Sequence, residues 1–335
     1  MTIEVFTTCP PSEAPGGKAF LDRVGEVSRW TEEAGYAGML VYTDNSLADP
    51  WLVAQAVLDS TQRILPLVAT QPVYMSPYTA ARMVMSTAFL RERRLAINLV
   101  TGGSPTHLKA LGDETEHDAR YARLTEYAQV MQTLLARCRP VSHTGEHYRL
   151  KGATLPHRVP EELLPTYYLS GSSPASRQAA AALGVTRLAY PLTPAEYAAQ
   201  PDATGGEWGI RIGVIARSTS GAAWDVALSR FPEDPAGERL HRVSARMSDS
   251  QWYAELSTTA AGGGRDAYWL YPFRTYRTFC PYLVGSYDEV GAVLRAYLDL
   301  GVRTLVLDVP AEREDLDHTW TALAAADSSL TPASR

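Results

Sequence analysis

Short apolar segments alternate with amphipathic segments along most of the chain, and this alternation restricts the folds that the chain can adopt. Eight apolar runs read as buried strands, and most gaps between them show helical spacing, as at Phe20, Val24 and Val27. The runs cover residues 3–6, 38–41, 64–69, 95–99, 166–169, 187–189, 210–216 and 304–308. This count predicts an α/β fold, a (β/α)8 TIM barrel with insertions, with a doubly wound open sheet as the alternative.

Two regions depart from the alternation. Residues 231–282 read as an insertion, in which an aromatic and arginine-rich stretch from Arg265 to Arg277 follows three glycines, Gly262–Gly264. The insertion is either a mobile lid hinged at the glycines or a segment of an interface, since both uses favour Tyr, Trp and Arg. The last residues, 324–335, read as a fraying tail.

Composition limits the protein class. A length of 335 residues with 45% hydrophobic residues suits one domain over residues 1–335. The net charge of −6, without a long basic run, argues against nucleic acid or a membrane surface as the main partner. The three cysteines form no CxxC pair, and no metal site is predicted. No signal pattern or long apolar run is visible, so we expect a cytoplasmic protein.

The loops that follow the strands carry the candidate site. Those at residues 43–45, 71–76, 101–106 and 170–173 contain groups suited to an anionic, aromatic cofactor. The most informative stretch runs from Arg94 to Pro105, where Asn98 interrupts an apolar strand and two glycines follow it. A buried amide requires a hydrogen-bond partner, and the glycines allow backbone N–H groups to approach a ligand closely.

Small residues before a predicted helix suggest a phosphate site. Gly171, Ser172 and Ser173 lie just ahead of the helical segment that starts at Pro174. Free N–H groups and the positive end of a helix bind phosphate. Ordinary N-capping by one of the serines is the alternative, and the pattern alone does not separate the two.

Arg211 is a charged residue within an apolar strand, residues 209–215. If its side chain faces the barrel interior, it must be paired or bind an anion. If it faces outward, it is a solvated charge. The apolar character of the strand favours the inward orientation.

Together these motifs resemble the bacterial luciferase-like flavin monooxygenases, and within them the alkanesulfonate monooxygenase branch. The resemblance covers residues 5 to about 309 and is strongest in the segments Asp49–Ala54, Asn98–Gly102, Arg120–Tyr121, Gly171–Ser173 and Gly209–Arg211. It implies a luciferase-like barrel with an insertion that moves over the active site. Such barrels usually pair, so a homo-oligomer, a dimer or tetramer, is expected.

The resemblance also implies a cofactor and its partners. Members of the family use reduced FMN, which a separate NAD(P)H:flavin reductase supplies, and combine it with dioxygen as a flavin hydroperoxide that oxygenates a small organic substrate. By resemblance, the cofactor-binding residues are Thr43, Gln71 and Asn98 at the flavin ring and Thr101, Tyr121, Gly171, Ser172 and Ser173 at the phosphate. Arg211 and Arg277 resemble the two catalytic arginines that the sulfonatases use for substrate and peroxide.

The sequence departs from the sulfonatase pattern at the substrate side. Leu47 stands where those enzymes have a cysteine, Gly213 where they have a histidine, and Val309 and Pro310 where they have a tyrosine. The flavin-holding half therefore matches and the substrate-handling half does not, which favours a substrate from specialised biosynthesis over an alkanesulfonate. A deazaflavin-dependent dehydrogenase on the same barrel and a non-catalytic flavin-binding protein are the competing hypotheses.

Overall fold

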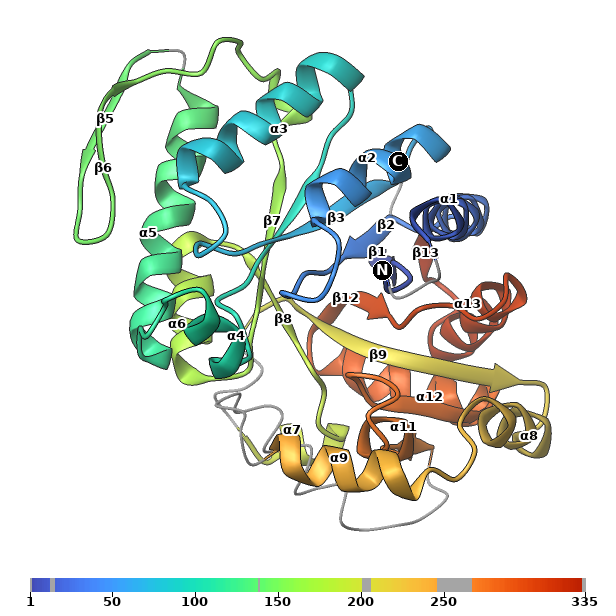
Figure 1. Cartoon of the computed structure of the whole chain (residues 1–335). Helices are drawn as coiled ribbons and strands as arrows, with labels where there is room; N and C mark the ends of the chain where they lie inside the picture. The colour runs from blue at the N-terminus through green and yellow to red at the C-terminus, as the bar shows by residue number, and fades with distance from the viewer. Residues whose placement is uncertain (1, 13–15, 138, 201–205, 246–266, 333–335) are drawn as a thin grey trace.

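A closed parallel barrel forms the centre of the protein (Figure 1). The computed structural model describes residues 2–12, 16–137, 139–200, 206–245 and 267–332. Within this part of the chain, eight parallel strands follow the order β9-β12-β1-β2-β3-β4-β7-β8, and β8 pairs with β9 to close the ring. The strands are β1 (Thr2–Thr8), β2 (Gly38–Val41), β3 (Leu65–Thr70), β4 (Ala96–Leu99), β7 (Thr166–Ser170), β8 (Thr186–Ala189), β9 (Trp208–Arg217) and β12 (Val302–Leu307). The predicted (β/α)8 barrel is confirmed, and the open sheet was the wrong alternative.

Helices surround this barrel on its outside (Figure 1). Several begin where the sequence offers a capping side chain, such as Asp49, whose carboxylate accepts from the backbone N–H groups of Trp51 and Leu52. No helix in the described ranges is long and apolar enough to cross a bilayer. The helices are α1 (Gly17–Glu33), α2 (Pro50–Ser60), α3 (Pro77–Arg91), α4 (Pro105–Ala110), α5 (His117–Ala136), the 3-10 turn η1 (Glu161–Leu163), α6 (Pro174–Leu183), α7 (Pro194–Ala198), α8 (Ser220–Arg230), α9 (Pro235–Ala245), α11 (Tyr271–Arg274), α12 (Tyr287–Asp299) and α13 (Glu314–Ala326).

The barrel interior is filled by side chains. Phe6 of β1 packs edge-to-face on Tyr168 of β7, with ring centroids 5.6 Å apart. The same cluster includes Leu40, Leu67, Ala96, Leu188 and Val306. Because this core occupies the middle of the barrel, space for a ligand remains at the ends of the strands.

The predicted insertion contains structure that the sequence pattern did not reveal. The strand β11 (Tyr282–Ser286) lies parallel to the second half of β9, residues 213–217, and β10 (Tyr268–Trp269) pairs with β11. The first half of β9 makes the barrel pairings with β8 and β12. The predicted hinge at Gly262–Gly264 lies outside the described residues.

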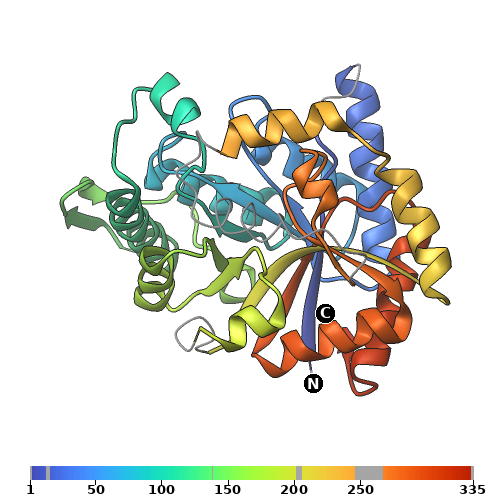
Figure 2. The ribbon, with the colours of Figure 1, turned by 90° about the horizontal axis from the view of Figure 1, so that it is seen from below.

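The chain ends close to where it begins (Figure 2). The predicted fraying tail was wrong for residues 324–326, which belong to α13, and for β13 (Thr331–Pro332), which pairs with β1 at Thr2 and Ile3. The start of β1 offers free backbone groups there, and β13 satisfies them.

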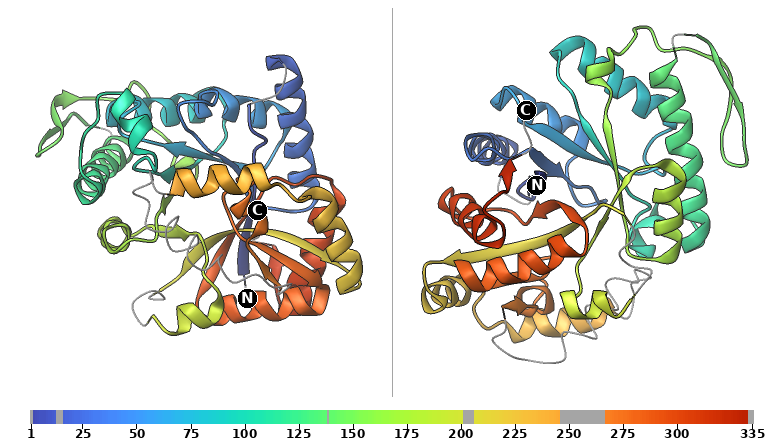
Figure 3. Two further views of the ribbon diagram at one scale, coloured as in Figure 1. Left: turned by 60° about the horizontal axis from the view of Figure 1, so that its bottom comes forward. Right: turned by 180° about the vertical axis from the view of Figure 1, so that it is seen from behind.

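A hairpin of β5 (Val141–Thr144) and β6 (Arg149–Ala153) projects beside α5, as the sequence predicted (Figure 3). Its turn is fixed by Glu126 of α5. The carboxylate of Glu126 accepts from the backbone N–H groups of His147 and Tyr148, each at 2.9 Å, and lies 2.9 Å from the His143 ring.

Candidate active site

A cavity of about 470 Å³ lies at the carboxyl ends of the barrel strands. The polar loops after β2, β3, β4 and β7 contribute to it, together with α5 and β9. Parallel strands direct these ends to one face of the barrel, where ligands bind in this fold. The predicted site residues that line it are Thr43, Gln71, Asn98, Thr101, Tyr121, Gly171, Ser172, Ser173 and Arg211.

One end of the cavity is formed by the loop from β7 to α6. Ser173 is the N-cap of α6, and its hydroxyl accepts from the backbone N–H of Ser176 at 3.2 Å. The hydroxyl of Ser172 is different, because its oxygen is buried and finds no hydrogen-bond partner within the described part of the chain. The capping interpretation therefore applies to Ser173, whereas Ser172 is left for a ligand.

Glycine at position 171 allows Tyr121 and Ser176 to pack closely against the backbone at this end. Its φ of +155° is one that side chains disfavour, and a Cβ there would lie 2.4 Å from Tyr121 Oη and 2.5 Å from Ser176 Cβ. Gly102, with φ of +86°, similarly approaches Gln71, whose Nε2 would lie 2.6 Å from an added Cβ. Both glycines are required for close backbone approach.

Arginines surround the same end, and the sequence reasoning assigned none of them to the site. Arg120 of α5 is 4% exposed and lines the cavity. Arg177 donates to the carbonyl of Ser172 at 2.9 Å, and Arg187 donates to the carbonyl of Gly171 at 3.3 Å. A helix N-terminus, a buried hydroxyl and the guanidinium of Arg120 in the cavity wall form a suitable receptor for a phosphate, whereas Arg177 and Arg187 hold the loop carbonyls.

The middle of the cavity contains the buried amide. Asn98 of β4 accepts a hydrogen bond from Ser170 Oγ of β7 at 2.8 Å through its Oδ1. The expected partner of this amide is thus the neighbouring strand. The side chains of Gln71 and Thr101 are buried to a similar degree as Asn98.

The other end of the cavity is formed around Arg211. Its guanidinium lies over the rings of Tyr42 and Tyr190, 5.5 and 5.8 Å from their centroids, and Nη1 donates to Tyr190 Oη at 3.1 Å. Burial alone would lower the pKa of Arg211, but Tyr190, Cys280 and Asp308 outweigh it and hold the pKa above its ordinary value. The inward orientation expected from the strand is confirmed.

Arg277 is placed elsewhere. Its side chain is 58% exposed and forms an ion pair with Asp234 at 2.8 Å, and it does not line the cavity. Its neighbours in the insertion, Tyr276 and Phe279, do line the cavity. The insertion therefore reaches the site through aromatic side chains, and the catalytic role of Arg277 stays a prediction.

A family model described as luciferase-like monooxygenase matches residues 1–304. The chain belongs to this family. The 4-(gamma-L-glutamylamino)butanoyl-(BtrI acyl-carrier protein) monooxygenase BtrO of Niallia circulans is 30% identical over 329 residues, which cover 95% of this chain and 95% of BtrO. The predicted enzyme class, a flavin-dependent monooxygenase of the luciferase-like type, is thereby confirmed.

Solved structures support the fold. The EDTA monooxygenase EmoA from Chelativorans sp. BNC1 gives a TM-score of 0.73 at 16% identity, covering 98% of this chain and 95% of EmoA. An F420-dependent secondary alcohol dehydrogenase gives a TM-score of 0.66 at 16% identity, covering 97% of this chain and 99% of its own. The barrel alone is therefore compatible with more than one flavin-type cofactor.

Proposed function

We propose that this luciferase-like monooxygenase uses reduced FMN, which a separate NAD(P)H:flavin reductase supplies, to oxygenate a small organic substrate of a biosynthetic pathway. The observation that carries the proposal is the buried hydroxyl of Ser172 at the N-terminus of α6, which has no hydrogen-bond partner among the described residues. A buried polar atom without a partner is costly unless a ligand satisfies it. The phosphate of FMN is such a ligand.

The residues around Ser172 fit the whole phosphate group. Ser173 and the first turn of α6 supply the positive helix end, Arg120 supplies charge, and Gly171 lets Tyr121 and Ser176 pack directly against the loop backbone. Thr43, Gln71 and Asn98, which line the same cavity, would hold the flavin ring. Reduced flavin supplies the electrons that activate dioxygen.

Apolar side chains form much of the cavity wall. Leu40, Ala69, Leu188 and Val306 line its floor, and Tyr276 and Phe279 of the insertion line its side. A dry pocket strengthens the field of Arg211 on any developing negative charge and limits wasteful reaction with water. The insertion therefore contributes to the cavity wall together with the barrel.

The substrate side supports a biosynthetic substrate over an alkanesulfonate. BtrO, which matches nearly the whole chain, is named for an acyl group on a carrier protein. Leu47 and Gly213 replace the cysteine and histidine that the sulfonatase resemblance would require. A deazaflavin-dependent dehydrogenase is the second candidate, because a dehydrogenase of that type shares the fold.

The test compares cofactors under anaerobic conditions. The purified protein is titrated with reduced FMN and with reduced F420, and each complex is then mixed with oxygenated buffer while its absorbance is followed. We expect tight binding of reduced FMN and a reoxidation course that differs from that of free FMN. Tight F420 binding without an oxygen-dependent change would favour the dehydrogenase, and reoxidation at the free rate would favour a binding protein.

A further inference from the structure

Arg211 faces the cavity from one side and a carboxylate from the other. Asp308 follows β12, beside β9, and its backbone N–H donates to the carbonyl of Ile212 at 3.2 Å. Its Oδ1 lies 3.7 Å from Arg211 Nη2, and both side chains are 11% exposed. At this separation the carboxylate balances the charge of Arg211 without occupying its hydrogen-bond donors.

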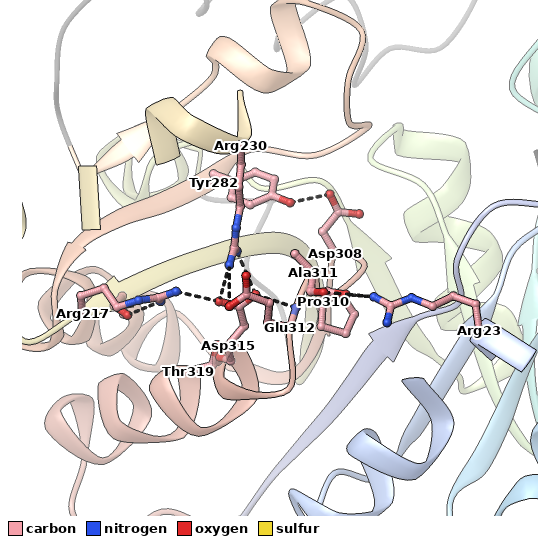
Figure 4. A network of polar contacts seen from close by, with 11 residues as sticks. Arg23, Arg217, Arg230, Tyr282, Asp308, Pro310, Ala311, Glu312, Asp315 and Thr319 are labelled. Carbon is pink, nitrogen blue, oxygen red and sulfur yellow. Dashed lines mark hydrogen bonds and ion pairs between the residues drawn. The ribbon is translucent and has the colours of Figure 1, made fainter. Parts of the chain in front are cut away.

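A tyrosine hydroxyl holds the carboxylate in place. Tyr282 of β11 donates to Asp308 Oδ2 at 2.8 Å (Figure 4). An ionised carboxylate only accepts hydrogen bonds, which matches this donor. The ring of Tyr282 fills the space above Gly213, where an added Cβ would lie 2.4 Å from the ring.

The loop after Asp308 is fixed as well. Arg23 of α1 donates to the carbonyl of Ala311 at 3.0 Å, and Asp315 of α13 binds both Arg217 and Arg230 (Figure 4). Contacts of Tyr282 therefore hold the Asp308 carboxylate itself, and contacts of Arg23 and Asp315 hold the loop that follows it. Its distance from Arg211 is a property of the fold.

One donor of Arg211 remains available. Its Nε is buried and has no hydrogen-bond partner among the residues that the structure describes. A ligand atom that accepts from Nε would meet a guanidinium whose charge Asp308 already balances. A second anion there would be repelled by Asp308, whereas a neutral carbonyl oxygen would gain the hydrogen bond without that repulsion.

We infer that Asp308 determines substrate specificity by balancing Arg211, so that this end of the cavity takes the uncharged carbonyl of an acyl thioester or amide in preference to a sulfonate or carboxylate. The inference rests on the proposed function, because it names the substrate class of the same cavity. It assigns Asp308 a role in selection and Tyr282 a role in positioning.

The test measures ligand preference by calorimetric titration. The probes share one chain length: the N-acetylcysteamine thioester of hexanoic acid, which is neutral, and hexanesulfonate, which is anionic. The full chain is titrated with each probe, once saturated with oxidised FMN and once without FMN. We expect the wild-type protein to bind the thioester at least about tenfold more tightly than the sulfonate.

Two variants separate charge from structure. Asp308→Asn removes the charge at nearly constant shape and is expected to shift the preference at least about tenfold toward the sulfonate. Tyr282→Phe keeps the charge and loses one hydrogen bond, so a shift of less than about threefold is expected. Asp327→Asn is the matched control, since that carboxylate pairs with Arg295 away from the cavity, and it should leave the preference unchanged.

Three results would overturn the inference: a wild-type preference for the sulfonate, no thioester binding at millimolar concentration, or equal shifts in Asp308→Asn and Tyr282→Phe. Equal shifts would mean that the cluster acts only as packing. FMN affinity is measured for the same protein samples. The titrations without FMN report the preference between thioester and sulfonate whether or not FMN binds. A failure of the FMN proposal is thus distinguishable from a failure of the specificity assignment.

Discussion

Removing the hydroxyl of Ser172 should weaken FMN binding without weakening the fold. The Ser172 oxygen is buried and has no partner in the described part of the chain, so Ser172→Ala removes an unsatisfied polar atom from the ligand-free protein. Such an atom costs roughly 1–3 kcal/mol. The free energy of unfolding without ligand should therefore stay unchanged or rise.

With FMN bound, the same hydroxyl would donate to a charged phosphate. A hydrogen bond to a charged group contributes about 1.5–3 kcal/mol, and each 1.4 kcal/mol is about tenfold in Kd. Ser172→Ala should then raise the Kd for FMN about 10- to 100-fold. Riboflavin has no phosphate, so its Kd should change by less than about twofold.

The assay is quenching of flavin fluorescence on binding, together with urea unfolding in the absence of flavin. Thr219→Ala is the control for loss of a hydroxyl that does form a hydrogen bond in the fold. The Thr219 hydroxyl caps α8 by accepting from the backbone N–H of Ala222 at 3.2 Å. That variant should lose about 1 kcal/mol of stability and keep its FMN affinity. If Ser172→Ala lowered stability, or weakened FMN and riboflavin equally, the phosphate assignment would be refuted.

Three further outcomes are expected. Arg211→Ala should abolish turnover while oxidised-FMN affinity stays nearly unchanged; near-normal turnover in a steady-state assay would show that the guanidinium plays no part in the reaction. The hydrogen bonds from Arg123 lower the pKa of Asp113 to about 2, so this carboxyl stabilises the fold above its ordinary pKa near 3.8 and loses that contribution as the pH falls through about 2. Urea titrations should show a flatter pH dependence for Asp113→Asn in this window, and parallel curves would contradict it. Asp315→Asn should destabilise the fold by about 3–5 kcal/mol in the same assay, because two arginines share this buried carboxylate; a loss below about 1 kcal/mol would argue against the pairing.

The barrel and the end of the cavity at the β7–α6 loop could be predicted because their signals are local. A strand that runs into Gly102 and Gly103, or Ser172 placed just before a helix, reports its own environment within a few residues. Backbone N–H groups at a helix start can bind an anion, and their position follows directly from the helix boundary. The structure places all of these residues around one cavity.

The substrate end could not be predicted because its contacts join distant segments. Tyr190, Arg211 and Asp308 lie on three different strand ends and meet only when β8, β9 and β12 pair. β11 was missed since it pairs with the half of β9 that extends beyond the barrel contacts. Arg277 stood in an arginine-rich run, and nothing local indicated that Asp234 would pair with it.

Gly213 shows why the departures from the sulfonatase pattern do not amount to a lost active site. Gly213 of β9 has no side chain, and the ring of Tyr282 from β11 fills the space. A Cβ added at position 213 would lie only 2.4 Å from that ring. The phenol then holds Asp308 toward Arg211. A site that had only lost catalysis would keep a void or fill it with apolar side chains, whereas here the replacement brings its own ordered polar contacts. The cluster therefore argues for altered selection of the substrate and against a protein that merely stores flavin.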